Sequence, residues 1–274
     1  MNKKIVIVGG GTAGWMTAAY LAKYYGSENI TVVESSSIPK IGVGESVTPH
    51  VKDFFDEIGI NENDWMAETG AVHKYANKFV DWCGNNDYQY FSFNYTTPTS
   101  NFYKDIPGNR FKEDFTDTTT QPRSIDELSN FCLDKTYDRF DQYFCPQFHY
   151  MEKNVSPYKD NQVVLNQAYS YAHHINAELA GNYIKTKIAS DVTNIIADVV
   201  NVNIKENNIT SIDLNDGSTL TADWFIDCSG FSRVLVNAMQ WERKVYDTPI
   251  DSAWVCQTDY ENPSEEMVNY TQSI

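Results

Sequence analysis

The sequence predicts an α/β fold in which a parallel sheet carries an inserted antiparallel meander. The apolar run Ile5–Val8 is typical of a parallel strand that is buried on both faces. Helical spacing follows over Thr12–Tyr25, and a second apolar run occupies Ile30–Glu34. Because the crossover in a strand–helix–strand unit is nearly always right-handed, the two strands lie parallel in one sheet. After residue 199 the apolar period changes to two, which indicates antiparallel strands.

The remaining elements follow in chain order. A helical pattern around Phe54 and Ile58 ends at Gly59, and the apolar run from Lys78 to Trp82 predicts a strand. Periodicity is poor over about residues 85 to 160, where we expect an irregular second layer. The spacing of apolar residues over Tyr169–Ile188 predicts an amphipathic helix.

The meander itself is predicted by three short runs and two turns. Alternation marks Val200–Lys205 and Ile209–Leu214, and a third strand is expected around Leu220. Asn207-Asn208 and Asp216-Gly217 separate them as hairpin turns. A last strand of the parallel sheet is expected from Trp224 to Asp227.

Composition restricts the class of protein. With 274 residues, 42% of them hydrophobic and 14% aromatic, the chain is long enough for one large or two ordinary globular domains. A net charge of −16 disfavours nucleic acid and anionic membranes as partners. The five cysteines include no C-x-x-C pair, so we expect neither a disulfide framework nor a thiolate zinc site. With no apparent signal peptide or membrane span, these features predict a soluble cytoplasmic protein.

A dinucleotide-binding fingerprint joins the first strand to the first helix. Gly9, Gly11 and Gly14 form the G-x-G-x-x-G pattern, and Glu34 ends the next strand 20 residues after Gly14. The glycines allow a tight turn, close approach of the backbone to a pyrophosphate, and helix packing, while the helix N-terminus favours negative charge. Thr12 and Ala13 lie inside the motif. Glu34 should accept hydrogen bonds from the adenosine ribose.

This fingerprint alone does not separate NAD from FAD. A late strand that ends in Asp227 and is followed by Gly230 suggests a second contact to an extended cofactor, which favours FAD. The alternative for Asp227 is a turn or helix-capping residue. The expected fold is therefore Rossmann-like and FAD-binding.

Four motifs, in order, resemble the flavin-dependent tryptophan halogenase family, and the predicted helix and meander after them are also similar to it. Most of the chain except its middle takes part in the resemblance. The motifs are Gly9-Gly-Gly-Thr-Ala-Gly-Trp15, Ile41-Gly-Val-Gly-Glu-Ser46 with Pro49, Gly70-Ala-x-x-Lys74-x-x-x-Lys78-Phe-Val-x-Trp82, and Phe225-Ile-Asp-Cys-Ser-Gly-Phe231.

The resemblance implies a reaction and its participants. In that family reduced FAD, which a separate flavin reductase supplies, reacts with oxygen and a halide ion, and hypohalous acid reaches a lysine beside a small aromatic substrate. By motif match that lysine is Lys74, with Lys78 as its rival and a solvated surface lysine as the alternative for either. An ammonium can polarise hypohalous acid, whereas a neutral amine can be N-halogenated.

The resemblance also places further cofactor contacts. Val199 corresponds to a position whose backbone meets the adenine, although a buried core valine is an equal alternative. A glycine loop would lie along the flavin and close the halide site, consisting of Gly42, Val43, Gly44, Glu45 and Ser46. No metal is expected, because the five histidines show no H-E-x-x-H or H-x-x-E-H spacing.

The chain also departs from the family pattern. Family members are about twice as long, and their Trp-x-Trp-x-Ile-Pro motif and second-half acidic residue have no counterpart here. We therefore expect an FAD-binding domain over residues 1–82 and 165–235, and a partial substrate-side region over 83–164 and 236–274. A fragment, or a subunit that pairs with a C-terminal half or a second copy, is then expected. Ser232-Arg233 also replaces the usual Arg-Gly.

Two other functions remain open on the sequence alone. One is a flavin monooxygenase that hydroxylates its substrate, and the other is a non-catalytic FAD-binding module. Neither the identity and regiochemistry of the aromatic substrate nor the choice of halide follows from the sequence, because the expected substrate-side region is incomplete.

Overall fold

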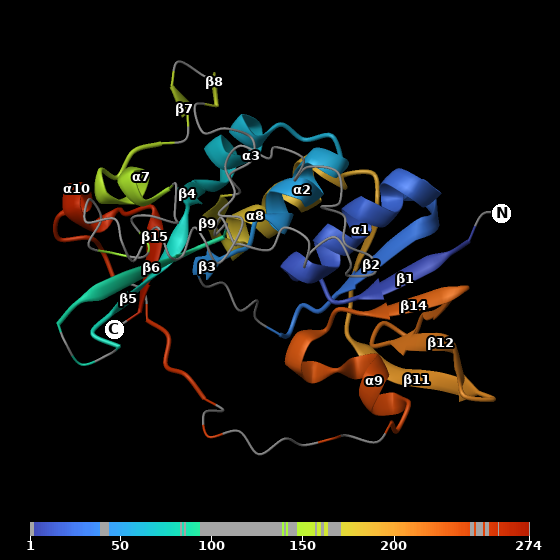
Figure 1. Cartoon of the computed structure of the whole chain (residues 1–274). Helices are drawn as coiled ribbons and strands as arrows, with labels where there is room; N and C mark the ends of the chain where they lie inside the picture. Colours follow the sequence, from blue (N-terminus) through green and yellow to red (C-terminus); the bar gives the residue numbers. More distant parts are fainter. Residues whose placement is uncertain are drawn as a thin grey trace, which may run out of the picture. The chain divides into compact units, whose positions relative to one another are not determined.

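The computed structural model consists of two compact units, which are described separately (Figure 1). The first unit comprises Met1–Glu45, Phe54–Ala71 and Ile175–Thr258, and the second comprises Ser46–Asp53, Val72–His174 and Asp259–Ile274. The structure describes residues 3–38, 44–82, 84, 86–93, 139, 141, 147–156, 158–159, 162–163, 171–241, 244, 249, 252–256 and 258–273.

A parallel sheet is the centre of the first unit. Its strands are β1 (Ile5–Val8), β2 (Ile30–Glu34), β10 (Thr193–Ile196) and β14 (Trp224–Asp227), in the order β10-β2-β1-β14. All three strand pairs are parallel. The prediction of a parallel sheet is therefore confirmed, with β10 as an additional edge strand.

The helix α1 (Thr12–Tyr25) connects β1 to β2 and packs against the sheet. Trp15, Ala18 and Ala19 on its inner face are buried. The helix ends at Gly26, whose φ of 84° lies in the region that favours glycine. The predicted strand–helix–strand unit is thus present with the expected bounds.

The antiparallel meander is formed by β11 (Val199–Lys205), β12 (Asn208–Leu214) and β13 (Thr219–Thr221), as predicted. Its first turn lies one residue earlier than expected, at Glu206 and Asn207, which both have positive φ. Two successive residues with positive φ are the signature of the tight turn that suits the strand twist.

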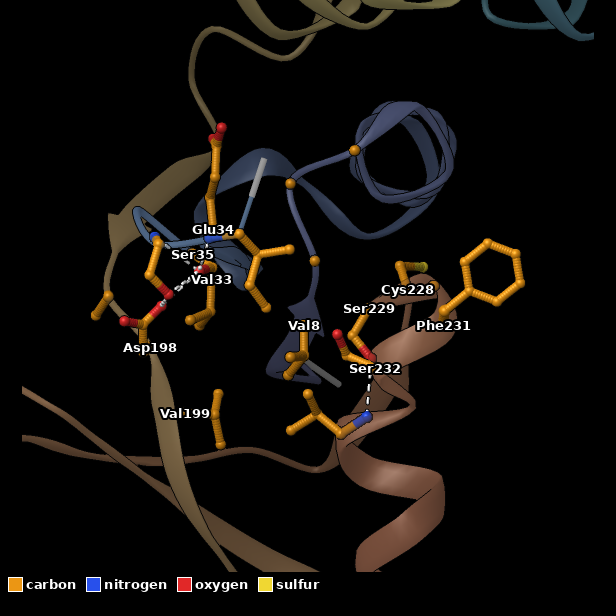
Figure 2. Close-up of a pocket in the computed structure, with 18 residues that line it drawn as sticks. Val8, Val33, Glu34, Ser35, Asp198, Val199, Cys228, Ser229, Phe231 and Ser232 are labelled. Carbon is orange, nitrogen blue, oxygen red and sulfur yellow. Dashed lines mark hydrogen bonds between the residues drawn. The ribbon is translucent and has the colours of Figure 1, made fainter. Parts of the chain in front are cut away.

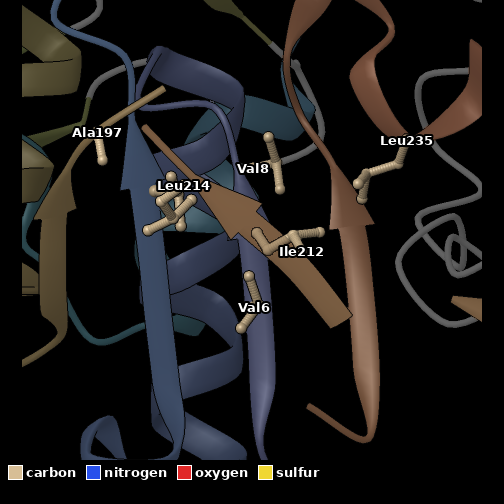
Figure 3. Close-up of a cluster of buried hydrophobic side chains, with 7 residues drawn as sticks. Val6, Val8, Ala197, Ile212, Leu214 and Leu235 are labelled. Carbon is tan, nitrogen blue, oxygen red and sulfur yellow. The ribbon is translucent and has the colours of Figure 1, made fainter. Parts of the chain in front are cut away.

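One hydrophobic cluster joins the meander to the sheet. Figure 3 shows β12 crossing in front of β1 and β2, with α1 on the other side of the sheet. Alternation along β1 directs two valines toward the meander and two isoleucines toward the opposite face. The buried members of the cluster are Val6, Val8, Val33, Ala197, Ile212, Leu214 and Leu235.

The single helix predicted over Tyr169–Ile188 is wrong. Its first part is the strand β9 (Ala172–Asn176), followed by the helix α8 (Ala177–Tyr183) and a π-helical turn, Ile184–Ile188. Asn176 starts α8 by accepting hydrogen bonds from the backbone N–H groups of Glu178 and Leu179. Before this cap, residues 172–176 form a strand because they pair with β4, although the spacing of their apolar residues is helical.

Among its described residues, the second unit is built on two three-stranded sheets and a two-stranded hairpin, except that Gly44 and Glu45 of β3 and Ile175 and Asn176 of β9 belong to the first unit. One sheet has the order β15-β5-β6 and the other the order β3-β9-β4. An aromatic cluster that includes Tyr75, Tyr90, Phe148 and Tyr171 lies in its core. The elements are β3 (Gly44–Ser46), β4 (Val72–Lys74), β5 (Ala76–Val80), β6 (Tyr88–Ser92), β7 (Tyr158–Lys159), β8 (Gln162–Val163), β15 (Tyr270–Ser273), α7 (Phe148–Glu152) and α10 (Pro263–Glu266).

The unit boundaries differ from the expected domains. The segment 72–82 belongs to the second unit because β5 pairs with β6 and β15, while residues 236–258 belong to the first. No described helix is both long and apolar enough to cross a membrane. The other helices are α2 (His50–Glu57), α3 (Glu62–Thr69) and α9 (Val234–Ala238), with short 3₁₀ turns at Ser27–Asn29 and Gly230–Ser232.

Candidate functional site

A pocket of about 480 Å³ lies in the first unit, at the carboxyl ends of the parallel strands. This edge is where α/β sheets bind their ligands. Figure 2 shows Asp198 and Val199 on one side of the pocket and Ser229 and Phe231 on the other. The lining residues are Val8, Gly9, Gly10, Gly11, Val33, Glu34, Ser35, Ser37, Ile38, Ala197, Asp198, Val199, Cys228, Ser229, Gly230, Phe231, Ser232 and Val234.

The glycines of the fingerprint meet different demands. At Gly9, φ is 121° and a Cβ would lie 2.2 Å from the carbonyl oxygen of Cys228. At Gly14, a Cβ would lie 1.9 Å from the carbonyl oxygen of Gly9, so only glycine lets α1 pack against the loop. A Cβ at Gly11 meets nothing within 4 Å. Gly11 is therefore the glycine whose side of the loop is open for a ligand.

The N-terminus of α1 is available to an anion. Gly11 stands at the N-cap and has no side chain to accept from the first N–H groups of the helix. Thr12 donates its hydroxyl to the carbonyl of Ala177, 2.9 Å away, and thereby ties this end of α1 to α8. Ala13 is exposed in the first turn and Gly14 is buried.

Glu34 lines the pocket, and its carboxylate is engaged in an ion pair with Lys185. Its Oε2 accepts from Lys185 Nζ at 2.7 Å and from Asn194 Nδ2 at 3.4 Å. The side chain packs so closely over Gly10 that a Cβ there would lie 2.3 Å from its Cγ. Lys185 therefore holds the carboxylate of Glu34 in one orientation without the help of a ligand.

Sequence reasoning missed a polar cluster beside Val199. Asp198 Oδ1 accepts from the hydroxyl of Ser35 at 2.5 Å and from that of Ser37 at 3.1 Å. All three line the pocket, and the backbone N–H of Ala197 donates to the carbonyl of Glu34 nearby. The signal in the sequence was the run of serines directly after the second strand, together with Asp198 at the start of the meander.

Asp227 does not line the pocket. Its carboxylate instead accepts hydrogen bonds from the loop that follows β14, and that loop lines the pocket. Oδ1 accepts from the backbone N–H and the hydroxyl of Ser229, and Oδ2 accepts from the N–H groups of Leu235 and Val236 at the start of α9. Burial alone would raise the pKa of Asp227, but these hydrogen bonds hold it below its usual value. Gly230, with φ of 61°, lies in this loop and lines the pocket.

Lys74 is buried in the second unit, with only 3% of its surface exposed. It ends β4, and its Nζ donates to the hydroxyl of Ser46 at 2.5 Å and lies 5.0 Å from the centre of the Phe93 ring. Burial lowers the pKa of Lys74. A lysine in this position is held for chemistry or packing and is not a solvated surface residue.

Lys78 has a different environment. Its Nζ lies over three tyrosine rings, 4.1 Å from the centre of Tyr88, 5.1 Å from Tyr270 and 5.5 Å from Tyr90. These cation–π contacts connect β5 to its two neighbouring strands. The geometry therefore accounts for Lys78 as a structural residue and leaves Lys74 as the better candidate for reactivity.

The glycine loop is described only at its end. Gly42 and Val43 lie outside the described residues, and Gly44 and Glu45 are exposed at the start of β3. Ser46 is the member of this loop that the structure joins to another candidate residue, Lys74.

The chain is similar in sequence and in fold to known proteins. Residues 4–274 match the family described as tryptophan halogenase. The chain is 30% identical to the tryptophan 7-halogenase RebH of Lentzea aerocolonigenes, over 99% of this chain and 51% of that protein. The crystal structure of the tryptophan 6-halogenase SttH from Streptomyces toxytricini superposes with a TM-score of 0.70, at 29% identity, over 86% of this chain and 44% of that one.

A third similar structure is Tar14, a tryptophan C-6 flavin-dependent halogenase from taromycin biosynthesis, with a TM-score of 0.69 and 31% identity over 86% of this chain and 45% of that one. The fold and the sequence match together define the class: the chain belongs to the tryptophan halogenase family. It spans about half the length of the curated relatives it matches.

Proposed function

We propose that the protein binds FAD in the first-unit pocket and takes part in halogenating tryptophan or another electron-rich aromatic compound. The co-substrates are oxygen and a halide ion, and a separate flavin reductase supplies the reduced cofactor. The observation that carries this proposal is the combination of an open glycine turn at the N-terminus of α1 with a buried lysine on β4. The family membership supports both parts.

The residues that line the pocket suit the adenosine and pyrophosphate parts of an extended dinucleotide. Gly11 leaves room for a pyrophosphate beside the helix N-terminus, which favours its negative charge. Glu34 and the Ser35–Asp198 pair would receive the adenosine ribose, while Val199 would lie beside the adenine. Because Glu34 is a carboxylate, a 2′-phosphate would be repelled, which favours FAD over NADP. Asp227 and Gly230 shape the opposite wall of the pocket through the loop that follows β14.

Bound reduced FAD, with oxygen and halide, would supply hypohalous acid. The chain's own contribution is then the amine of Lys74. Three N–H donors on an ammonium allow it to hold Ser46 and still donate to the oxidant. The same burial that lowers its pKa also increases the fraction of neutral amine, which is the nucleophilic form. The described loop residues before Ser46, Gly44 and Glu45, are proposed to lie along the flavin, with their backbone N–H groups suited to the halide.

The cofactor part is tested by titrating FAD and NAD into the purified chain and following flavin fluorescence and melting temperature. FAD at a hundred times its dissociation constant should stabilise the fold by about 2.7 kcal/mol. A shift with NAD and none with FAD would remove the flavin proposal.

The reaction is tested with a flavin reductase, NADH, oxygen and halide, and a panel of indoles and phenols. Mass spectrometry separates the added mass of a halogen from that of the oxygen that a hydroxylase would add. The chain is assayed alone and with any polypeptide encoded downstream of Ile274. We expect the chain alone to halogenate poorly, because the expected substrate-side region is partial and a misplacement of the reacting groups by about 1 Å can lower the reaction rate 10²-fold. Lys74→Ala should remove halogenation and retain FAD binding, whereas the matched Lys78→Met variant should retain both.

A further inference from the structure

Lys74 belongs to a polar chain that extends beyond Ser46. The hydroxyl of Ser46 lies 2.7 Å from the hydroxyl of Thr271 on β15, and that hydroxyl lies 2.9 Å from Nε2 of His174 on β9. With the 2.5 Å contact between Lys74 and Ser46, these groups form one continuous series of short polar contacts. All four residues belong to the second unit.

Strand register explains why these side chains meet. In the β4–β9 pair, Lys74 stands opposite Ala172 and Val72 stands opposite His174, so Lys74 and His174 share one face. β9 lies between β3 and β4 in the sheet order. The buried Ala172 is small enough for the long side chain of Lys74 to reach across β9 to Ser46 on β3.

The donors and acceptors can be assigned in one direction. The ammonium of Lys74 can only donate, so the Ser46 oxygen accepts. In the arrangement that we propose, the Ser46 hydroxyl then donates to the hydroxyl of Thr271. Thr271 in turn donates to Nε2 of His174, which accepts when the imidazole is neutral and carries its proton on Nδ1. Burial, with the nearby charges of Lys74 and His173, lowers the pKa of His174 to about 4, so the ring is neutral near pH 7.

We propose that Ser46, Thr271 and His174 are positioning residues that hold the amine of Lys74 through this single hydrogen-bonded chain. A lysine side chain has four rotatable bonds, and a fixed acceptor at its end selects one placement of Nζ. His174 acts at a distance by orienting the Thr271 hydroxyl, which orients the Ser46 lone pair toward Lys74. The role in halogenation rests on the proposed function, whereas the effect on the amine does not.

The test measures the reactivity of the amine directly. The folded chain is labelled briefly with acetic anhydride at several pH values, and acetylation of Lys74 is measured by peptide mass spectrometry with Lys78 as the internal reference. Ser46→Ala removes the acceptor that stabilises the ammonium, so the labelling rate of Lys74 below its pKa should rise by about tenfold, the factor of a one-unit fall in pKa.

Thr271 offers a matched pair of variants. Thr271→Val keeps the shape of the side chain and removes the hydroxyl, and should raise the labelling rate of Lys74 by about threefold, half a pKa unit. Thr271→Ser retains the hydroxyl and should match the parent. His174→Gln, whose amide oxygen can accept, should also match the parent, whereas His174→Leu should behave like Thr271→Val. Lys78 should be unchanged throughout.

Equal labelling of Lys74 in the parent, Ser46→Ala and Thr271→Val, with unchanged melting temperatures, would overturn the proposal. A rise in Thr271→Ser equal to that in Thr271→Val would do the same, because the hydroxyl would then be irrelevant. FAD titration of the same samples separates the two proposals. If FAD does not bind but the labelling rates change as expected, the proposed function is wrong and the positioning role stands. If FAD binds but the labelling rates do not change, only the positioning role is wrong.

Discussion

The pocket of the first unit and the surroundings of Lys74 in the second are built in opposite ways. The pocket depends on the backbone. Gly9, Gly11 and Gly14 have no side chain, so the loop can lie close to the helix α1 and a ligand can lie close to the loop. The amine of Lys74 depends on side chains instead, because polar groups from β9, β15 and β3 form a series of contacts that ends at this one amine.

The difference teaches how local each requirement is. The glycine turn lies between one strand and the helix that follows it, and the contact that requires Gly14 is made with nearby Gly9, although the contact that requires Gly9 is made with distant Cys228. The contacts around Lys74 join residues that are far apart in sequence. Lys74 and Ser46 are separated by 28 positions, and Ser46 and Thr271 by 225. Four experiments sharpen this contrast.

The largest effect is expected for Gly11→Val. A Cβ there meets nothing within 4 Å, so the unliganded fold should retain its melting temperature, while the space for the pyrophosphate is lost. FAD affinity measured by fluorescence should fall by at least about 100-fold, which corresponds to about 2.7 kcal/mol. Normal FAD binding by a folded variant would show that Gly11 does not face the cofactor.

Gly14→Ala should damage the fold instead. Its Cβ would lie 1.9 Å from the backbone oxygen of Gly9, and a backbone atom moves only if α1 moves with it. We expect a loss of about 1–3 kcal/mol in the free energy of unfolding, measured by urea titration without ligand. If Gly14→Ala is as stable as the parent, the close packing of α1 on the loop is not required.

Asp227→Asn should have an effect that depends on pH. The folded-state pKa of Asp227 is lowered, so its carboxylate contributes stability above the ordinary value of 3.8, and this contribution is lost as the pH falls through the lower folded value. The variant should be less stable than the parent by about 1–3 kcal/mol at pH 7, and the gap should narrow below pH 3.8. Urea titrations of both proteins across this range provide the measurement, and a gap that is constant with pH would contradict the assignment.

The smallest effect is expected for Lys78→Met. The apolar stem is retained and the ammonium over Tyr88, Tyr90 and Tyr270 is removed, which should cost about 0.5–2 kcal/mol of stability. Lys78→Arg keeps a cation over the rings and serves as the matched control. A loss of halogenation without a loss of stability would return Lys78 to the candidate catalytic residues.

Much of the first unit could be predicted because local and tertiary preferences agree there. The strand β1, the helix α1 and the meander have apolar periods that match the faces they bury in the structure. The segment Tyr169–Ile188 shows the opposite case. Its spacing is helical, but pairing with β4 made its first half a strand and moved the helix start to Asn176.

The sequence by itself determined the glycine fingerprint, the parallel strands β1, β2 and β14, the antiparallel meander, and the family resemblance from which Lys74 is predicted. Those features depend on residue types at short spacing, which a linear chain displays directly. Only the tertiary structure decided that Glu34 pairs with Lys185, that Asp227 organises a loop, and that Lys78 lies over three rings. It also decided the partners of Lys74, because side chains from strands distant in sequence meet only after the register of each sheet is set.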